Sequence, residues 1–141
     1  ENTKLFGVFS QGITRPEDAS NSLISSVSDI KSSSFAGGVM RNSNFVENDT
    51  LGFAISSPLH VTDGSAMIDA PYGVDTNGNI YREKQALNLT PTGIEKDMEV
   101  FYKIPVNFGA LSVGAMHRIQ PGNIQNAPCE DLVMFKFGNM F

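Results

Sequence analysis

The sequence has almost no cysteine and no long apolar run, and each shortage excludes a class of protein. Cys129 is the one cysteine among 141 residues, so the chain cannot form an internal disulfide. It stands in a stretch rich in Pro, Gly and Asn, which indicates an incidental loop residue. No apolar run approaches the length of about 18 residues that a membrane helix needs. If this chain crosses a membrane, it must therefore cross as β-strands.

Charged residues are also scarce. They make up 18% of the chain, below the quarter that is usual in soluble domains. The net charge is -5 and the Lys and Arg residues form no cluster, which argues against a surface for nucleic acid. The length suits one domain, and we expect residues 1–141 to form a single β domain. Because the chain starts at Glu1 without an initiator Met or a signal segment, we expect it to be the C-terminal part of a longer protein.

The sequence is rich in alternation with a period of two residues. From Met98 to Val106 every second residue is apolar, and the alternate positions from 97 onward include Asp97, Glu99 and Lys103. This alternation is typical of a strand with one apolar and one polar face. Similar runs predict eight strands, at about 3–14, 28–41, 50–57, 64–70, 79–90, 95–106, 110–119 and 131–141.

Two alternatives to this reading of the strands stay open. Joining 50–57 to 64–70, or 79–90 to 95–106, lowers the number of strands to seven or six. Residues 17–30 are open to a short helix, although their Ser and Asn content opposes one.

Turn residues separate the expected strands. Residues 75–79 contain Asn-Gly, the strongest short hairpin signal. Thr62-Asp63-Gly64 and Thr90-Pro91-Thr92-Gly93 also predict tight turns. Because the connections are mostly short, we predict an all-β fold, an antiparallel up-and-down meander. Such a meander forms an outer-membrane-type β-barrel or a fragment of one, or it folds into a sandwich. A closed membrane barrel needs at least about eight strands, so a six-stranded piece would require others.

The last expected strand carries a pattern of its own. Counted back by twos from the C-terminus, Phe141, Phe137, Phe135 and Val133 share one face, with Asn139 among them. Aromatic and apolar residues on one face, with small or polar ones on the other, are typical of a membrane strand. A final Phe on such a strand resembles the signal that the outer-membrane barrel-assembly machinery recognises in bacterial proteins. Asn139 departs from that signal, which usually has an apolar residue there.

Several segments resemble a known family. Residues 51–61 (LGFAISSPLHV) are similar to an "LG-x-A-x-SQPL-R-V" segment, and residues 87–95 (LNLTPTGIE) to an "L-x-L-x-P-x-G-x-E" turn. Residues 99–106 and 115–122 continue the similarity. Together they resemble the C-terminal region of bacterial subtilisin-like (S8) serine proteases, which is autotransporter-like.

The resemblance implies a function for the segment. It would be an outer-membrane β-barrel, acting as the translocator or anchor of an N-terminal protease passenger domain. Its partners would be that passenger, outer-membrane lipid and the barrel-assembly machinery, with no nucleic acid and no cofactor. The catalytic residues of the family belong to the protease domain, so we expect none in this segment.

The residues themselves support no catalytic or metal site. His60 and His117 lack the Gly-rich surroundings of a subtilisin site. Residues 75–79 have the Asp-Asn-Asn spacing that begins a calcium loop, but the Gly and Glu required further on are missing, so a hairpin turn is favoured. In a barrel, Asp97, Glu99 and Lys103 would face the lumen.

A second hypothesis stays open. A soluble β-sandwich, as a secreted accessory or binding domain of a protease, would show the same alternation. The two hypotheses differ in the direction of the apolar face, which points outward in a membrane barrel and inward in a sandwich. An enzymatic role for the segment itself is the weakest hypothesis.

Overall fold

The structure, a computed structural model, describes residues 2–17 and 23–139. It confirms the all-β antiparallel fold: within the described residues there are nine strands and one short 3-10 turn, Pro121–Asn123. The strands are β1 (Thr3–Thr14), β2 (Ile24–Val27), β3 (Ile30–Asn42), β4 (Thr50–Asp63), β5 (Ser65–Val74), β6 (Ile80–Asn88), β7 (Lys96–Val106), β8 (Gly109–Ile119) and β9 (Glu130–Asn139).

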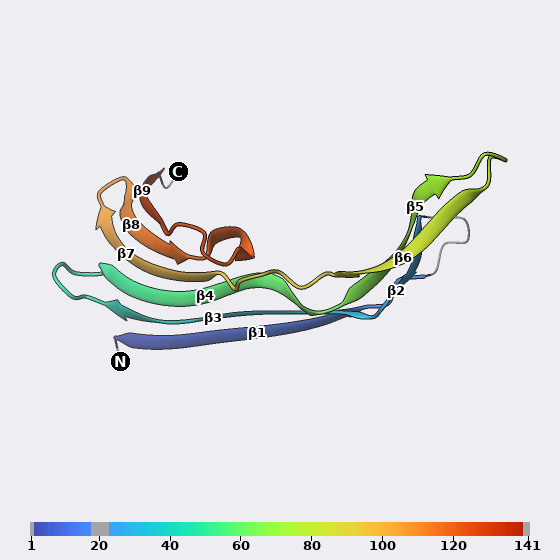
Figure 1. Cartoon of the computed structure of the whole chain (residues 1–141). Helices are drawn as coiled ribbons and strands as arrows, with labels where there is room; N and C mark the ends of the chain where they lie inside the picture. The colour runs from blue at the N-terminus through green and yellow to red at the C-terminus, as the bar shows by residue number, and fades with distance from the viewer. Residues whose placement is uncertain (1, 18–22, 140–141) are drawn as a thin grey trace. The chain divides into compact units, whose positions relative to one another are not determined.

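The chain divides into two compact units. Unit 1 consists of Glu1–Ser10, Ser34–Leu59 and Thr92–Phe141, and unit 2 of Gln11–Ser33 and His60–Pro91. In unit 1, β7, β8 and β9 lie side by side after β4 (Figure 1). In unit 2, β5 lies between β2 and β6.

The six-stranded sheet has the order β1-β3-β4-β7-β8-β9, and the other sheet has the order β2-β5-β6. β4 pairs with β7 from Thr50 opposite Lys103 to Ser56 opposite Asp97. β5 pairs with β6 from Ser65 opposite Asn88 onward. Residues 57–64 and 89–96 are equal in length, so the β4–β7 ladder and the β5–β6 ladder share one register as far as Pro71. Between Pro71 and Gly73 a bulge shifts the β5–β6 register.

This shared register corrects two of the expected turns. Residues 62–64 and 90–93 do not reverse the chain, because β4 pairs with β7 rather than with β5. Gly64 alone separates β4 from β5, and its carbonyl accepts a hydrogen bond from the N–H of Leu89 (3.0 Å). β4 and β5, like β6 and β7, are nevertheless separate strands that belong to different sheets.

The remaining differences lie near residues 17–30. The short helix left open for residues 17–30 does not form in the described part of this stretch, because Ile24–Val27 forms β2, a strand that the sequence pattern missed. Residues 18–22 lie outside the described residues. β2 exists because it pairs with β5, from Ile24 opposite Ile68 to Val27 opposite Ala66. Such a long-range partner leaves no signal in a four-residue segment.

The connections in unit 1 differ between its two ends. At one end are the two-residue turn at Asn107 and Phe108, the loop 43–49, and the last described residue, since Asn139 lies opposite Gly109. The N-terminal segment reaches the same end, where the carbonyl of Asn2 accepts from the N–H of Asn42 (2.8 Å). We call this the turn end. At the other end, the loop end, the chain leaves unit 1 for residues 11–33 and 60–91 and forms the loop 120–129.

The described residues contain almost no apolar core. Ala66 is the one buried hydrophobic residue among them. The other buried side chains are polar or charged, namely those of Asp49, Ser57, Glu95 and Asp97. A soluble domain of this length normally buries its large aliphatic and aromatic side chains. In the described residues, many large aliphatic and aromatic side chains lie at the surface instead.

Candidate membrane-facing surface and inner charges

The registers of β4, β7, β8 and β9 collect apolar residues on one side of unit 1, which we call the apolar face. Phe53 lies opposite Val100, which lies opposite Ala115, and Ala115 lies opposite Val133. The next rows toward the turn end are also apolar; they are Tyr102, Val113 and Phe135, then Ile104, Leu111 and Phe137.

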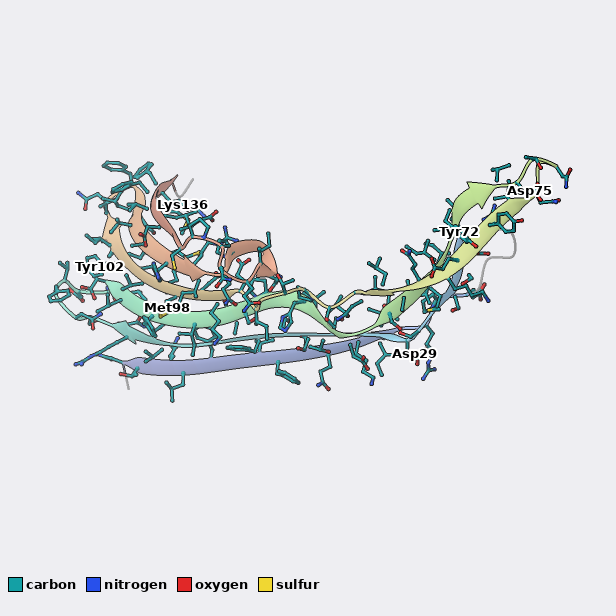
Figure 2. All side chains as sticks on the ribbon, viewed as in Figure 1. Asp29, Tyr72, Asp75, Met98, Tyr102 and Lys136 are labelled. Carbon is teal, nitrogen blue, oxygen red and sulfur yellow. The ribbon has the colours of Figure 1, made fainter. Side chains whose placement is uncertain are left out.

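The large side chains of this face are exposed rather than packed. Phe53 is 45% exposed, Val100 46% and Leu111 44%. Figure 2 marks Met98 and Tyr102, which lie on this face of β7. Toward the loop end, the apolar face ends at His117, which lies opposite Met98. Nδ1 of His117 lies 2.7 Å from Oδ1 of Asp131.

The terminal strand contributes the most exposed part of the apolar face. Val133, Phe135 and Phe137 are 66%, 78% and 53% exposed, and their partners in β8 are Ala115, Val113 and Leu111. The segment that was expected to carry the assembly signal therefore forms β9, and Val133, Phe135 and Phe137 share one face of this strand. Phe141 lies outside the described residues, so its part of the prediction stays a prediction.

Aromatic rings gather at the turn end of unit 1. The ring of Phe108, in the β7–β8 turn, lies 5.8 Å from the ring of Phe137. The ring of Phe45, in the loop 43–49, meets that of Tyr102 edge to face at 5.8 Å. Phe45 and Phe108 are 79% and 65% exposed.

The opposite side of the sheet, which we call the polar face, carries the charges predicted from the sequence. Asp97, Glu99 and Lys103 share this side of β7, since they alternate with the apolar face. Each belongs to a row across β7, β8 and β9. The rows are Asp97, Arg118 and Glu130; Glu99, Met116 and Leu132; and Lys103, Ser112 and Lys136.

An ion-pair network lies at the loop end of the polar face. Arg118 Nε donates to Glu95 Oε1 at 3.1 Å, and its Nη2 donates to the same oxygen. Arg118 Nη1 donates to Glu130 Oε2 at 2.7 Å, and Nε lies 3.6 Å from Asp97 Oδ1. Burial raises the pKa of Glu95, but hydrogen bonds from Arg118 and from the Gly122 N–H, with the Arg118 charge, lower it below its ordinary value.

A second buried carboxylate organises the loop 43–49. Asp49 accepts from the N–H groups of Asn44 (2.6 Å), Phe45 (2.8 Å) and Val46 (3.0 Å), and from the Tyr102 hydroxyl (2.6 Å). Burial raises the pKa of Asp49, but these four bonds outweigh it and hold the pKa well below its usual range. The strand pattern of the sequence does not predict this role of Asp49; the local signal for it is an Asp that follows Asn-rich turn residues.

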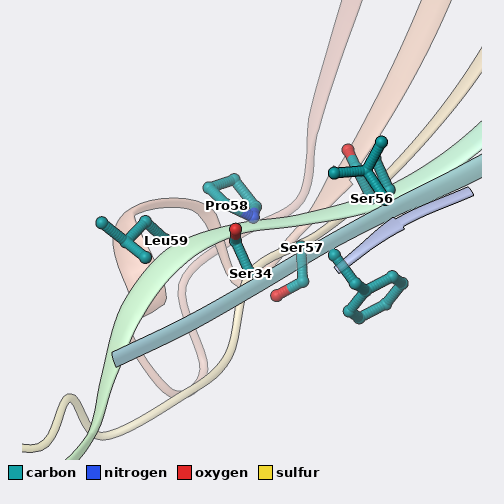
Figure 3. A pocket seen from close by; sticks show the side chains of 8 residues that line it. Ser34, Ser56, Ser57, Pro58 and Leu59 are labelled. Atoms are coloured by element: carbon teal, nitrogen blue, oxygen red, sulfur yellow. The ribbon is translucent and has the colours of Figure 1, made fainter. Parts of the chain in front are cut away.

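Unit 1 has a shallow hollow of about 260 Å³ between β1, β3 and β4 (Figure 3). Ser57 and Pro58 point to opposite sides of β4 in this view. The Ser57 side chain is 1% exposed, and its hydroxyl has no hydrogen-bond partner among the described residues. The lining is mostly apolar, with three serines and no titratable residue among the side chains that line it.

The other residues singled out from the sequence have structural places. Asp75 caps the β5–β6 hairpin, accepting from the N–H groups of Asn77 and Asn79 (both 2.8 Å) and from Asn79 Nδ2 (2.7 Å). Gly78 has a φ of 85°, as this turn requires. These bonds form the predicted hairpin turn. His60 lies in β4, within unit 2, and the exposed Cys129 precedes β9.

In the part of the chain that the structure describes, no group of three or more His, Cys, Asp or Glu side chains is placed to hold a metal ion. The same residues include no helix long and apolar enough to span a membrane. In comparisons with protein-family models, curated proteins and solved structures, nothing matched this chain.

Proposed function

We propose that this chain is a segment of a bacterial outer-membrane β-barrel. It would be the C-terminal translocator or anchor of a secreted subtilisin-like protease, without a catalytic site of its own. The observation that carries the proposal is the direction of the apolar side chains. They cover one exposed face of unit 1, while Asp97, Glu99, Lys103 and Lys136 lie on the other. Lipid on one side and water on the other would suit both faces.

Strand length agrees with this function. β7 and β8 have 11 residues each, and a tilted strand needs about 9–11 residues to cross the hydrocarbon core. The rows from Met98 to Val106 supply the apolar side chains over that length.

The connections and the aromatic rings suggest an orientation. Outer-membrane barrels have short periplasmic turns and longer external loops, with aromatic side chains at the interfaces. The turn end has the two-residue connection and the rings of Phe45, Phe108 and Phe137. We therefore assign the turn end of unit 1 to the periplasm and its loop end to the outside.

The sheet of this chain would be part of the barrel wall. Its described edges, β1 and β9, are not neighbours in the strand order, so closure requires either their pairing or further strands. The larger sheet has six strands in the described residues, below the minimum of about eight for a closed membrane barrel. Further strands would complete the wall.

A soluble sandwich remains the competing function. It would place the apolar face against a second sheet and leave the charged face wet. In unit 1, the exposed fractions of Phe135 (78%) and Val133 (66%) favour the lipid-facing arrangement.

The test uses the absence of tryptophan from the chain. Phe135→Trp places the single Trp on the apolar face of β9, and Met134→Trp places it one residue away on the polar face. Each variant is folded into phosphatidylcholine vesicles with brominated acyl chains. We expect strong quenching of the Phe135→Trp emission and weak quenching of the Met134→Trp emission.

For the same variants, aqueous iodide should quench in the opposite order if the polar face meets water. Equal quenching by brominated lipid would contradict the proposal. So would a chain that is folded and monomeric in buffer without detergent or lipid, which would favour the sandwich.

A further inference from the structure

The loop 120–129 bends over the polar face of unit 1. Its Gly122 N–H donates to Glu95 Oε2 at 2.6 Å. The other oxygen of the same carboxylate binds Arg118, which shares a polar-face row with Asp97 and Glu130. The first half of the loop therefore lies on the charged side of the sheet, away from the apolar face.

The backbone of the loop is in direct contact with residue 93. A Cβ placed on Gly93 would lie 2.7 Å from the backbone N of Gln125 and 2.9 Å from the carbonyl carbon of Ile124. Gly93 is buried. Only a residue without a side chain permits the loop to lie so close.

Hydrogen bonds fix the loop along the segment 92–95. Gly93 N–H donates to the carbonyl of Asn123 (2.9 Å), and Ile94 N–H donates to Gln120 Oε1 (2.9 Å). Glu95 N–H donates to Asn123 Oδ1 (2.9 Å), and Gln125 N–H to Thr92 Oγ1 (3.1 Å). Apolar packing contributes less, since the largest apolar side chain of the loop, Ile124, is 57% exposed.

We propose that residues 120–127 form a constriction loop, which narrows a passage for small hydrated ions along the polar face. This inference rests on the proposed function, because the passage exists only where the polar face lines the lumen of a completed barrel. The Glu95–Arg118 pair positions the carboxylate that accepts from Gly122 N–H, and it holds the loop together with the four bonds along residues 92–95. The ion-conducting width would then depend on this loop and its bonds rather than on the barrel wall alone.

The main test measures single-channel conductance of the full chain in planar lipid bilayers. Arg118→Ala removes the group that orients the Glu95 carboxylate, and the loop should then leave the passage. We expect a rise in conductance on the order of twofold, as the passage widens. Lys103→Gln is the matched control for the loss of one positive charge on the polar face, because Lys103 lies on the same face of β7 but at the turn end, away from the loop.

A second variant covers the case in which Arg118→Ala does not fold. Gln120→Ala with Asn123→Ala removes the side-chain acceptors for Ile94 and Glu95 and leaves Arg118 intact. The conductance should rise in this variant too. Equal conductance in wild type and in a folded, loop-released variant would overturn the constriction.

Hydrogen exchange gives a readout that needs no channel. The N–H groups of Gly122 and Gln125 should be protected in the wild type and should exchange faster in both loop variants, with Lys103→Gln unchanged. Unaltered protection in Arg118→Ala would show that the pair does not hold the loop. If the wild-type chain fails to enter bilayers at all, the proposed function itself fails and the passage with it, whereas insertion with unaltered conductance removes only the constriction.

Discussion

Gly52 lies beneath the aromatic ring of Phe101, its direct partner across the β4–β7 ladder. A Cβ at residue 52 would collide with Cζ and Cε1 of that ring. Phe101 thus covers a glycine on the polar face and fills space that would otherwise hold a side chain. Similar contact occurs at Gly38, where a Cβ would lie 2.7 Å from the Phe6 ring.

We expect Gly52→Ala to destabilise the sheet, because the added methyl group would force the Phe101 ring away from its position over the backbone of residue 52. The cost should be about 1–3 kcal/mol in the free energy of unfolding, as for other overpacked sites. Gly114→Ala is the matched control, since the nearest atom to its added Cβ would be 3.5 Å away. Urea unfolding of detergent-solubilised protein compares the two. Equal losses would show that the ring contact is not the cause.

A charge on the apolar face should be costly only in lipid. Ala115 lies on that face between Val100 and Val133, and its neighbour Met116 lies on the polar face opposite Glu99. We expect Ala115→Lys to lower the free energy of unfolding from vesicles by about 2–4 kcal/mol if it lies near the midplane. Met116→Lys should cost far less, because its ammonium group can pair with Glu99. If the two variants lose the same stability in vesicles, the assignment of the faces is wrong.

The loop 43–49 should loosen in acid. The pKa of Asp49 is lowered in the folded chain, so its contribution to stability is present above its ordinary unfolded pKa. That contribution is lost as the pH falls below the ordinary value and through the lowered folded one. Protection factors of the Asn44, Phe45 and Val46 amides should therefore drop at the acid end of a pH series.

Asp49→Asn should remove this pH dependence and lower protection at neutral pH, since the amide oxygen is a weaker acceptor for three N–H groups. Asp63→Asn is the control, because Asp63 forms an exposed ion pair with Lys31 in unit 2. A flat acid profile in the wild type would show that the Asp49 carboxylate does not hold this loop.

Deleting Phe141 tests the signal read from the C-terminal sequence. If the barrel-assembly machinery recognises the final strand, the deletion should sharply lower the amount of chain that resists urea extraction from outer membranes. Replacing Asn139 by Leu, which brings the strand closer to the usual pattern, should preserve or raise that amount. Normal assembly without Phe141 would show that the terminal residue is not the assembly signal. It would not bear on the lipid-facing surface, which the Phe135→Trp and Met134→Trp variants test.

Much of the architecture follows from local sequence signals. β1 has the predicted bounds, and β7 differs from its prediction by one residue at its start. Period-two alternation fixes which residues of a strand share a face, so Asp97, Glu99 and Lys103 lie together, as do Val133, Phe135 and Phe137. The hairpin at 75–79 also follows from its Asn-Gly signal, because that turn needs a positive φ at Gly78.

Pairing between distant segments decided the rest. Residues 62–64 and 90–93 have turn composition, yet neither forms a hairpin, because β4 pairs with β7 and β5 pairs with β6. Nor does composition bring Glu95 to Arg118 or Asp49 to Tyr102, which are far apart in sequence and meet through strand pairing and loop folding. The sequence alone determined that the chain forms two-faced strands, because side-chain alternation is a local property of extended backbone. Only the tertiary structure decided that the apolar face stays exposed and that a loop lies on the charged one, because both depend on which segments pair.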